Sequence, residues 1–279
     1  MQAVSVPQRR SQWMTEVIGA IGFIQRNYYL TKRYFLWEIV WLVYTTGNAM
    51  SIGFIGVAID SQTDTNRLTT YLLIGALVWS YLSMIFDILS ETVAWERWEG
   101  TIEYTFMSPV SRTTHLLGTS VYAVLYGIVR TAIIFVIFNI FFDLSISNAN
   151  FAGALLVLAV CSISLIGFGM MTAVMPLISP EKGQQVTMIV GSILLLISGV
   201  YYPIDVLPGW MQQLARLSPV TYALRGIRAA LLDGTPTSDL WGNIWPLLII
   251  GAVTVPAGLM IFSAGERFAK RTGRLKRNG

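Results

Sequence analysis

Six long apolar stretches in a chain with few charges constrain this sequence more than any other feature. Each holds about 20 mostly apolar residues, the length that a helix needs to cross the ~30 Å hydrocarbon layer of a bilayer. Charged residues make up only 12% of the chain and hydrophobic residues 54%, unlike ordinary soluble domains. We therefore predict an all-α integral membrane protein. The predicted spans cover residues 38–59, 70–90, 118–142, 151–176, 184–200 and 244–264.

The basic residues predict how these spans are oriented. Lysine and arginine precede the first span and cluster again after the last, and an even number of spans returns both ends of the chain to one side. Because such residues collect on the cytoplasmic side of membrane proteins, we expect both termini to be cytoplasmic. The chain then divides into residues 1–37, a six-span domain over residues 38–264 and a basic tail over residues 265–279.

An amphipathic helix is predicted before the first span. Over residues 11–34 apolar side chains such as Trp13, Val17 and Ile21 recur at helical spacing, but the segment is too polar to cross a bilayer. This pattern favours a helix lying in the membrane interface. The alternative is a helix packed on a cytosolic protein surface, and both interpretations place it on the cytoplasmic side.

Two short helices are predicted after the fifth span, which is itself unusually short. They cover residues 209–217 and 219–232 and are separated at Ser218-Pro219, because a residue that precedes proline is pushed out of helical geometry. Their apolar content favours short helices that re-enter the outer leaflet before the last span. The alternative is an ordinary surface loop with helical turns.

The segment between the second and third spans, residues 96–112, carries the most specific pattern. Gly100 can break the helix before it, Thr101 can cap the next helix, and Glu103 would lie near that helix's positive end. The acids of this segment would be unfavourable against an anionic leaflet, so a protein partner suits them better. The apolar side of the short helix is predicted to hold Ile102, Phe106 and Met107.

Two parts of the sequence resemble a known family. The run Glu-Gly-Thr, an acid two positions on and a closing Ser-Pro-Val-Ser-Arg look like the first cytoplasmic loop of type-2 ATP-binding-cassette (ABC) exporter permeases. Residues 199–228 are similar to the second hallmark of that family: a Gly and aromatic-Pro cluster, Leu-Pro-x-Trp and Ser-Pro-x-x-Tyr-Ala. With the spans and the N-terminal helix, the resemblance covers nearly the whole chain. It implies a coupling helix that receives the movement of ATPase subunits.

That resemblance and the loop sequence together assign residues to ATPase coupling. They are Arg97, Trp98, Glu99, Gly100, Thr101, Glu103 and Tyr104. Because the phosphate-binding pattern Gly-x-x-x-x-Gly-Lys-Ser/Thr does not occur in this sequence, ATP and Mg²⁺ are expected in a separate ABC ATPase. The family pattern implies two ATPase copies and two permease copies, here a homodimer, in the inner membrane of a prokaryote. Lipid is an expected partner, and nucleic acid is not.

Small residues of the first span permit close helix approach in such a dimer or within one bundle. They are Gly47, Ser51, Gly53 and Gly56. No catalytic or metal-binding residue is predicted, since the chain has one histidine, His115, and one cysteine, Cys161. A membrane-embedded lipid-modifying enzyme or assembly factor would need a cluster of such groups. A stand-alone secondary transporter would usually show repeats or several intramembrane carboxylates, of which Asp87 is the clear candidate.

The expected cargo is amphipathic, lipid-linked or glycan, and a few residues are candidates for its pathway. Arg130 falls near mid-bilayer and calls for a partner, Asp87 or Glu38, either as a structural pair or as a contact for a polar headgroup. Aromatic and methionine side chains deep in the spans either line a path or pack the bundle. The pathway candidates are Met50, Trp79, Tyr81 and Arg130, and the candidates for an outer gate are Tyr201, Tyr202 and Pro203.

Overall fold

A computed structural model describes residues 12–59, 65–142, 144 and 148–273. Over these residues the regular secondary structure is entirely helical. The α-helices are α1 (Gln12–Arg33), α2 (Phe35–Ile59), α3 (Thr65–Glu99), α4 (Ile102–Met107), α5 (Arg112–Phe141), α6 (Phe151–Thr172), α7 (Val174–Ile178), α8 (Pro180–Ile197), α9 (Gly209–Ala215), α10 (Pro219–Leu232) and α11 (Trp241–Arg271). Two 3₁₀ helices, η1 (Ile204–Val206) and η2 (Thr237–Leu240), complete the set.

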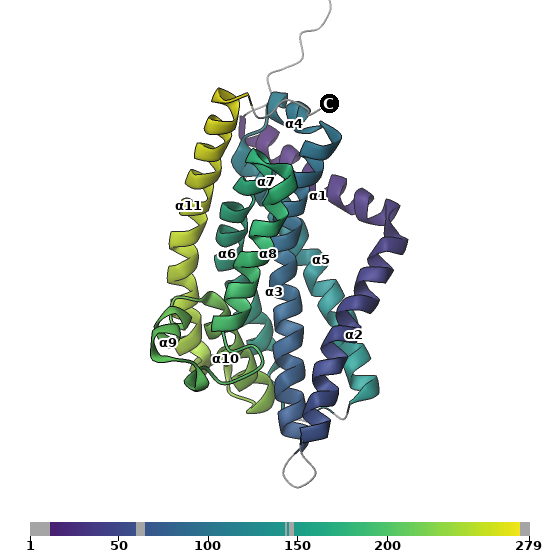
Figure 1. Cartoon of the computed structure of the whole chain (residues 1–279), viewed down its shortest axis with the longest axis vertical. Coiled ribbons are helices and arrows are strands. Elements are labelled where there is room, and N and C mark those ends of the chain that lie inside the picture. The colour runs from purple at the N-terminus through teal and green to yellow at the C-terminus, as the bar shows by residue number, and fades with distance from the viewer. Residues whose placement is uncertain (1–11, 60–64, 143, 145–147, 274–279) are drawn as a thin grey trace, which may run out of the picture.

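The helices form an elongated bundle whose two ends differ (Figure 1). The short helices α4 and α7 lie at one end, and α9 and α10 lie at the other (Figure 1). Helix α1 lies across the first of these ends, where α11 also finishes (Figure 1). We call them the α4 end and the α10 end. The segment predicted to couple and the segment predicted to shape the outer opening therefore lie at opposite ends.

Five helical stretches of the described chain are long and apolar enough to cross a membrane, which confirms an all-α integral membrane protein. They are Phe35–Ile59, Arg67–Glu99, Arg112–Phe141, Phe151–Ile178 and Thr237–Arg271, and they contain or largely overlap five of the six predicted spans. The remaining predicted span corresponds to α8, which also runs along the bundle (Figure 1). Because α8 begins with a polar segment that includes Glu181, Lys182 and Gln184, a crossing by α8 stays a prediction.

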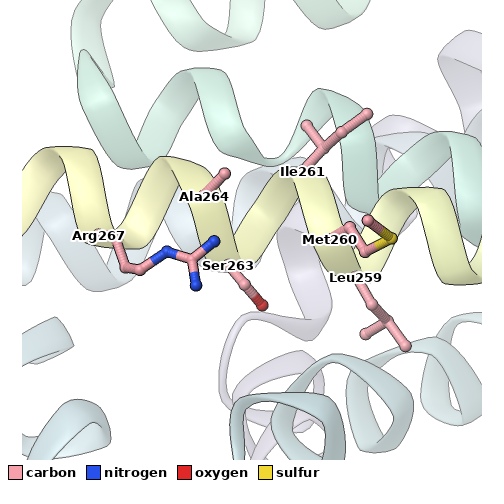
Figure 2. A pocket seen from close by; sticks show the side chains of 6 residues that line it. All are labelled: Leu259, Met260, Ile261, Ser263, Ala264 and Arg267. Carbon is pink, nitrogen blue, oxygen red and sulfur yellow. The ribbon is translucent and has the colours of Figure 1, made fainter.

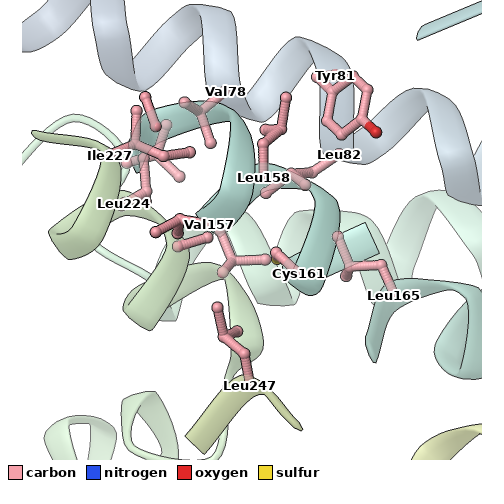
Figure 3. Close-up of a cluster of buried hydrophobic side chains, with 14 of the residues drawn as sticks. Val78, Tyr81, Leu82, Val157, Leu158, Cys161, Leu165, Leu224, Ile227 and Leu247 are labelled. Carbon is pink, nitrogen blue, oxygen red and sulfur yellow. The ribbon is translucent and has the colours of Figure 1, made fainter. Parts of the chain in front are cut away.

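The main core lies between α3, α6, α8, α10 and α11 (Figure 3). Val157, Cys161 and Leu165 of α6 are fully buried at its centre. The Tyr81 hydroxyl of α3 lies 2.7 Å from the Ser162 hydroxyl, so the polar end of this buried ring has a partner. This packing fixes α6 as the central helix against which the ends of the bundle are built.

Helices α6 and α11 approach each other closely. A side chain at Gly258 would lie 2.5 Å from the carbonyl oxygen of Gly167, so only glycine fits there. The hydroxyls of Ser164 and Thr254 each donate across the pair, to Leu247 O at 2.6 Å and to Ser164 O at 2.9 Å. Small residues and hydroxyl bonds are the usual means by which helices associate in a membrane.

Helix α2 is the least packed of the candidate spans. Within the most apolar window of each helix, 22% of α2 is buried against 72% of α3. Gly53 and Gly56 fit against α3, which supports the interpretation of these residues as packing within one bundle. Gly47 and Ser51 lie on the exposed face of α2 instead.

The two short helices predicted after α8 are present as α9 and α10 and are divided at Ser218-Pro219, as predicted. Helix α10 buries Val220, Ala223 and Ile227 in the main core. It is therefore part of the packed bundle, and the alternative of an ordinary surface loop does not describe it. Helix α9 is mostly exposed, and its Trp210 projects outward.

Candidate functional site

The candidate site is the corner at the α4 end where α3 turns into α4. Gly100 has a φ of 72°, a left-handed conformation that side chains other than glycine seldom adopt, so its position allows the reversal of direction. Thr101 occupies the position before α4, but its side chain makes no capping hydrogen bond, so the predicted cap is wrong. Its backbone is already helical there, with φ −81° and ψ −10°, whereas a capping residue is usually extended. Glu103 lies in the first turn of α4, as predicted.

One side of α4 is buried against the bundle. Ile102 is fully buried in a cluster of side chains from α3, α5, α6, α7 and α11, and Phe106 packs against its edge. The cluster contains Val93, Leu116, Met170, Ala173, Val174, Leu177 and Phe262. Because five other helices contribute to it, the position of α4 is tied to the packing of the whole α4 end.

The C-terminus of α4 is held by Arg112. Its Nη1 donates to the carbonyl oxygen of Thr105 at 2.6 Å, and its Nη2 donates to that of Phe106. Its Nε lies 3.2 Å from Oε1 of Glu266 in α11, and its guanidinium carbon lies 4.2 Å from the centre of the Phe106 ring. Lys270 donates to the same Glu266 oxygen at 2.6 Å. These groups join α4 to α5 and α11.

Helix α1 contacts the other side of the same corner. The Glu16 carboxylate accepts from the Ser111 backbone N–H at 3.1 Å and from the Ser111 hydroxyl at 3.0 Å, just before α5 begins. Hydrogen bonds from Thr114 and then Ser111 hold the pKa of Glu16 below its usual value. These contacts attach the N-terminal helix to the segment that follows α4.

A buried charge cluster lies one turn before the corner. Glu96 of α3 is 0% exposed, forms an ion pair with Arg26 of α1, and lies 3.3 Å from Nε2 of His115 in α5. The Phe23 ring covers His115 at a centroid distance of 4.5 Å. A buried carboxylate needs such partners, because an unpaired charge is costly away from water. The cluster ties α1, α3 and α5 together.

The outward side of α4 is acidic and aromatic. Glu99 and Glu103 are exposed, as is Trp98, and Tyr104 is 75% exposed. Met107 is also 75% exposed, so its predicted place on the apolar side with Ile102 and Phe106 is wrong. In this helix of six residues, the bundle buries Ile102 and partly covers Thr105 and Phe106, which lie one turn further on. Exposed apolar side chains beside acids suit a protein partner.

The predicted coupling residues thus fall into two groups. Trp98, Glu99, Glu103 and Tyr104 are exposed, while Arg97 is buried and offers little surface to a partner in this structure. Sequence reasoning missed the residues that hold the corner. They are Glu16, Arg26, Glu96, Arg112, His115, Glu266 and Lys270. An isolated acid among basic or apolar residues, such as Glu266, is the sequence feature that could have indicated these contacts.

The pathway candidates are dispersed. Tyr81 is buried in the main core and Trp79 packs on it, while Met50 packs on a separate cluster between α2, α3 and α5. Arg130 donates to the Trp41 carbonyl at 2.9 Å and to the Thr45 hydroxyl at 2.8 Å, both on α2. No ion pair with Asp87 or Glu38 is present among the described residues, and Glu38 accepts from Tyr126 instead.

The outer gate candidates lie at the α10 end. Gly199 has a φ of 71°, which turns the chain as α8 ends. Tyr202 and Pro203 line a small cavity there, while Tyr201 packs against the core.

A second hollow, on the face of α11, is lined by residues of α11 alone, so it brings no two elements together (Figure 2). Over the described residues, no three metal-binding side chains gather.

The chain is similar in sequence to known transporter permeases. The chain is 26% identical over 184 residues to the probable multidrug ABC transporter permease YbhR of Escherichia coli K12, covering 63% of this chain and 47% of that protein. It is 28% identical over 119 residues to the linearmycin resistance permease protein LnrN of Bacillus subtilis, covering 43% of this chain and 31% of that protein. The matched part of the chain thus spans about half the length of YbhR and about a third of the length of LnrN. Residues 23–232 match the family of ABC-2 type transporters, and the chain belongs to that family.

Proposed function

We propose that this chain is the membrane subunit of an ATP-driven exporter and that its α4 corner is where a separate ATPase binds. The proposal is carried by one observation: one side of α4 packs on the bundle and the other side is exposed. Ile102 and the hydrogen bonds of Arg112 fix one side of α4 to the bundle, while Glu103 and Tyr104 are exposed and can contact a partner. A helix that is fixed on one side and exposed on the other can pass a displacement from partner to bundle.

The proposed orientation places the α4 end in the cytoplasm. The basic last turns of α1 and α11, with Lys32, Arg33, Lys270 and Arg271, support this choice through the distribution of positive charge. In this assembly ATP and Mg²⁺ bind two ATPase copies, and each ATPase contacts one permease. Closure of the ATPases on ATP presses each α4, and the contacts of Arg112 and Glu16 carry the displacement into α5, α11 and α1.

A second copy of the chain is proposed to pack against α2. This helix is the least buried candidate span, and its exposed face contains Gly47 and Ser51, which allow close approach of another helix. The cargo would then leave through a path between the two copies. An amphipathic, drug-like cargo is supported by the names of YbhR and LnrN, which refer to multidrug transport and linearmycin resistance. Lipid-linked and glycan cargoes are the other classes to test.

The deciding experiment measures complex formation and coupled ATP hydrolysis. The purified chain is combined with a candidate ABC ATPase in lipid nanodiscs, and hydrolysis is measured with and without the permease. We expect a stable complex and stimulated hydrolysis. Charge reversal of the exposed acids, as Glu99→Lys with Glu103→Lys, should weaken the complex about tenfold or more, since charged contacts set partner choice.

The matched control reverses an acid at the same end of the bundle but away from α4. Glu181→Lys changes an exposed acid at the start of α8 and should leave complex formation unchanged. If Glu181→Lys weakens the complex as much as reversal of Glu99 and Glu103, the α4 corner is not the specific contact. If none of the candidate ATPases binds the unaltered chain, the proposal of an ATP-driven exporter fails.

A further inference from the structure

A cavity at the α10 end is lined by more positive than negative charge. It has a volume of about 160 Å³ and lies between α3, the connection from α8 to α9, and α10. Its charged lining residues are Arg225, Arg228 and Asp205. With two arginines and one aspartate, the lining has a formal charge of +1.

Arg228 is 9% exposed and has no acidic partner among the described residues. Its Nη atoms donate to neutral acceptors: the Tyr71 hydroxyl and the Gly199 carbonyl, both at 2.9 Å, and the Val200 carbonyl at 2.5 Å. The Tyr71 ring lies 3.5 Å from the guanidinium carbon. These groups hold the cation but leave its charge unneutralised, and its Nε has no hydrogen-bond partner.

Thr221 supplies a second unpartnered polar group in the same lining. It is 2% exposed, and its hydroxyl has no hydrogen-bond partner. On α10, Thr221 precedes Arg225 by four positions and Arg228 by seven, so the three side chains share one face. Other buried hydroxyl and guanidinium groups of the described chain also lack a partner, but Thr221 and Arg228 line the same cavity, so one group held there can bond to both.

We propose that this cavity binds a small oxyanion, a phosphate or carboxylate group, at Arg225, Arg228 and Thr221. The formal charge of +1 matches a monoanion, and Asp205 disfavours a second negative charge. Guanidinium and hydroxyl donors are the groups that recognise such oxygens. The oxyanion is either part of a lipid headgroup or free in solution. This site does not depend on the proposed ATPase partner, so the permease alone can test it.

The test measures anion-dependent stabilisation of the purified chain in nonionic detergent. Inorganic phosphate, acetate, dihexanoyl phosphatidic acid and dihexanoylglycerol, which has the same chains but no phosphate, are titrated separately, and the shift in unfolding temperature gives an affinity for each. We expect saturable stabilisation by phosphatidic acid and none by dihexanoylglycerol. Equal affinity for inorganic phosphate identifies a free oxyanion site, and binding of phosphatidic acid alone identifies a headgroup site. Both results support the proposal.

Three variants separate this site from general attraction of anions. Arg225→Gln removes an exposed charge from the lining and should weaken binding roughly tenfold, the loss expected of one charge-assisted hydrogen bond. Arg216→Gln removes an exposed charge at the same end but outside the cavity, and binding should not change. Thr221→Val should weaken binding without lowering the unfolding temperature of the anion-free chain, because the hydroxyl has no partner to lose.

Three results would overturn the proposal. The first is the absence of saturable stabilisation by every anion, and the second is equal stabilisation by dihexanoylglycerol and phosphatidic acid. The third is an equal loss of affinity in Arg225→Gln and Arg216→Gln, which would show attraction to positive charge in general. A normal affinity in Thr221→Val would exclude the threonine from the site.

Discussion

Arginine side chains that are partly or fully buried stabilise both ends of the bundle, but their partners differ. The α10 end also has an ion pair between Arg67 and Asp233, but both of its side chains are more than half exposed. At the α4 end, Arg26 and Arg112 reach the carboxylates of Glu96 and Glu266 on other helices. At the α10 end, Arg228 reaches only neutral carbonyl and phenol oxygens. Charge pairs that cross between helices join α1 to α3 and α5 to α11 at the α4 end. An unneutralised cation leaves the α10 end able to accept a further negative group.

The largest expected effect is at the buried charge of the α4 end. Glu96→Ala leaves Arg26 without its buried partner and should lower the free energy of unfolding by about 3–5 kcal/mol, the cost of breaking a buried ion pair. Equilibrium unfolding in mixed detergent micelles measures the change. The control Glu99→Ala removes an exposed acid of the same helix and should change stability by less than about 0.5 kcal/mol. Similar losses in both variants would remove the distinction between buried and exposed acids.

A smaller loss is expected at the α10 end. Arg228→Met keeps the length of the side chain but removes the donors to Gly199 and Val200, so the unfolding free energy should fall by about 1–3 kcal/mol. The same unfolding measurement applies, with the exposed Arg225→Met as control. A loss in Arg228→Met as large as that in Glu96→Ala would contradict the comparison of charged with neutral partners.

The turn at Gly100 tests whether the α4 end acts as a lever. Gly100→Val places a β-branched residue at a φ of 72° and should cost about 1–3 kcal/mol of stability or shift α4. In the assembled transporter, ATP hydrolysis should continue while cargo transport falls. Gly100→Asn is the rescue variant, because asparagine tolerates this conformation better than valine. Normal transport per ATP in Gly100→Val would show that the position of α4 does not control coupling.

The sequence predicts local features of this molecule well and contacts between distant segments poorly. The break at Ser218-Pro219 and the turn at Gly100 follow from the backbone preferences of single residues, and the structure has both. The outward position of Met107 could not be predicted, because six residues of helix are too short for a pattern to define a buried side. Tertiary packing, through the cluster around Ile102, decides it.

The contacts that define the site join residues far apart in the chain. Arg112 and Glu266 are 154 positions apart, and Arg26 and Glu96 are 70 positions apart. Spacing within one helix carries no information about such pairs. Arg130 shows the same limit: its depth in a span predicted that it needs a partner, but the partner in the structure is a carbonyl and a hydroxyl of α2 and not the expected carboxylate.

The smallest expected effect concerns Glu16, the half-buried acid that attaches α1 to the start of α5. Because hydrogen bonds from Thr114 and Ser111 hold its pKa below the usual 4.5, its ionised form is favoured in the folded state. Its contribution to stability is therefore complete above pH 4.5 and is lost as the pH falls through the lowered pKa. Glu16→Gln should show a weaker fall in unfolding temperature than the unaltered chain over this acidic range, and Glu181→Gln, an exposed acid at the start of α8, should not. Parallel pH profiles for the Glu16→Gln variant and the unaltered chain would mean that the Glu16 carboxylate is not what holds α1 to α5, and would leave Glu96 as the acid that attaches α1 to the bundle.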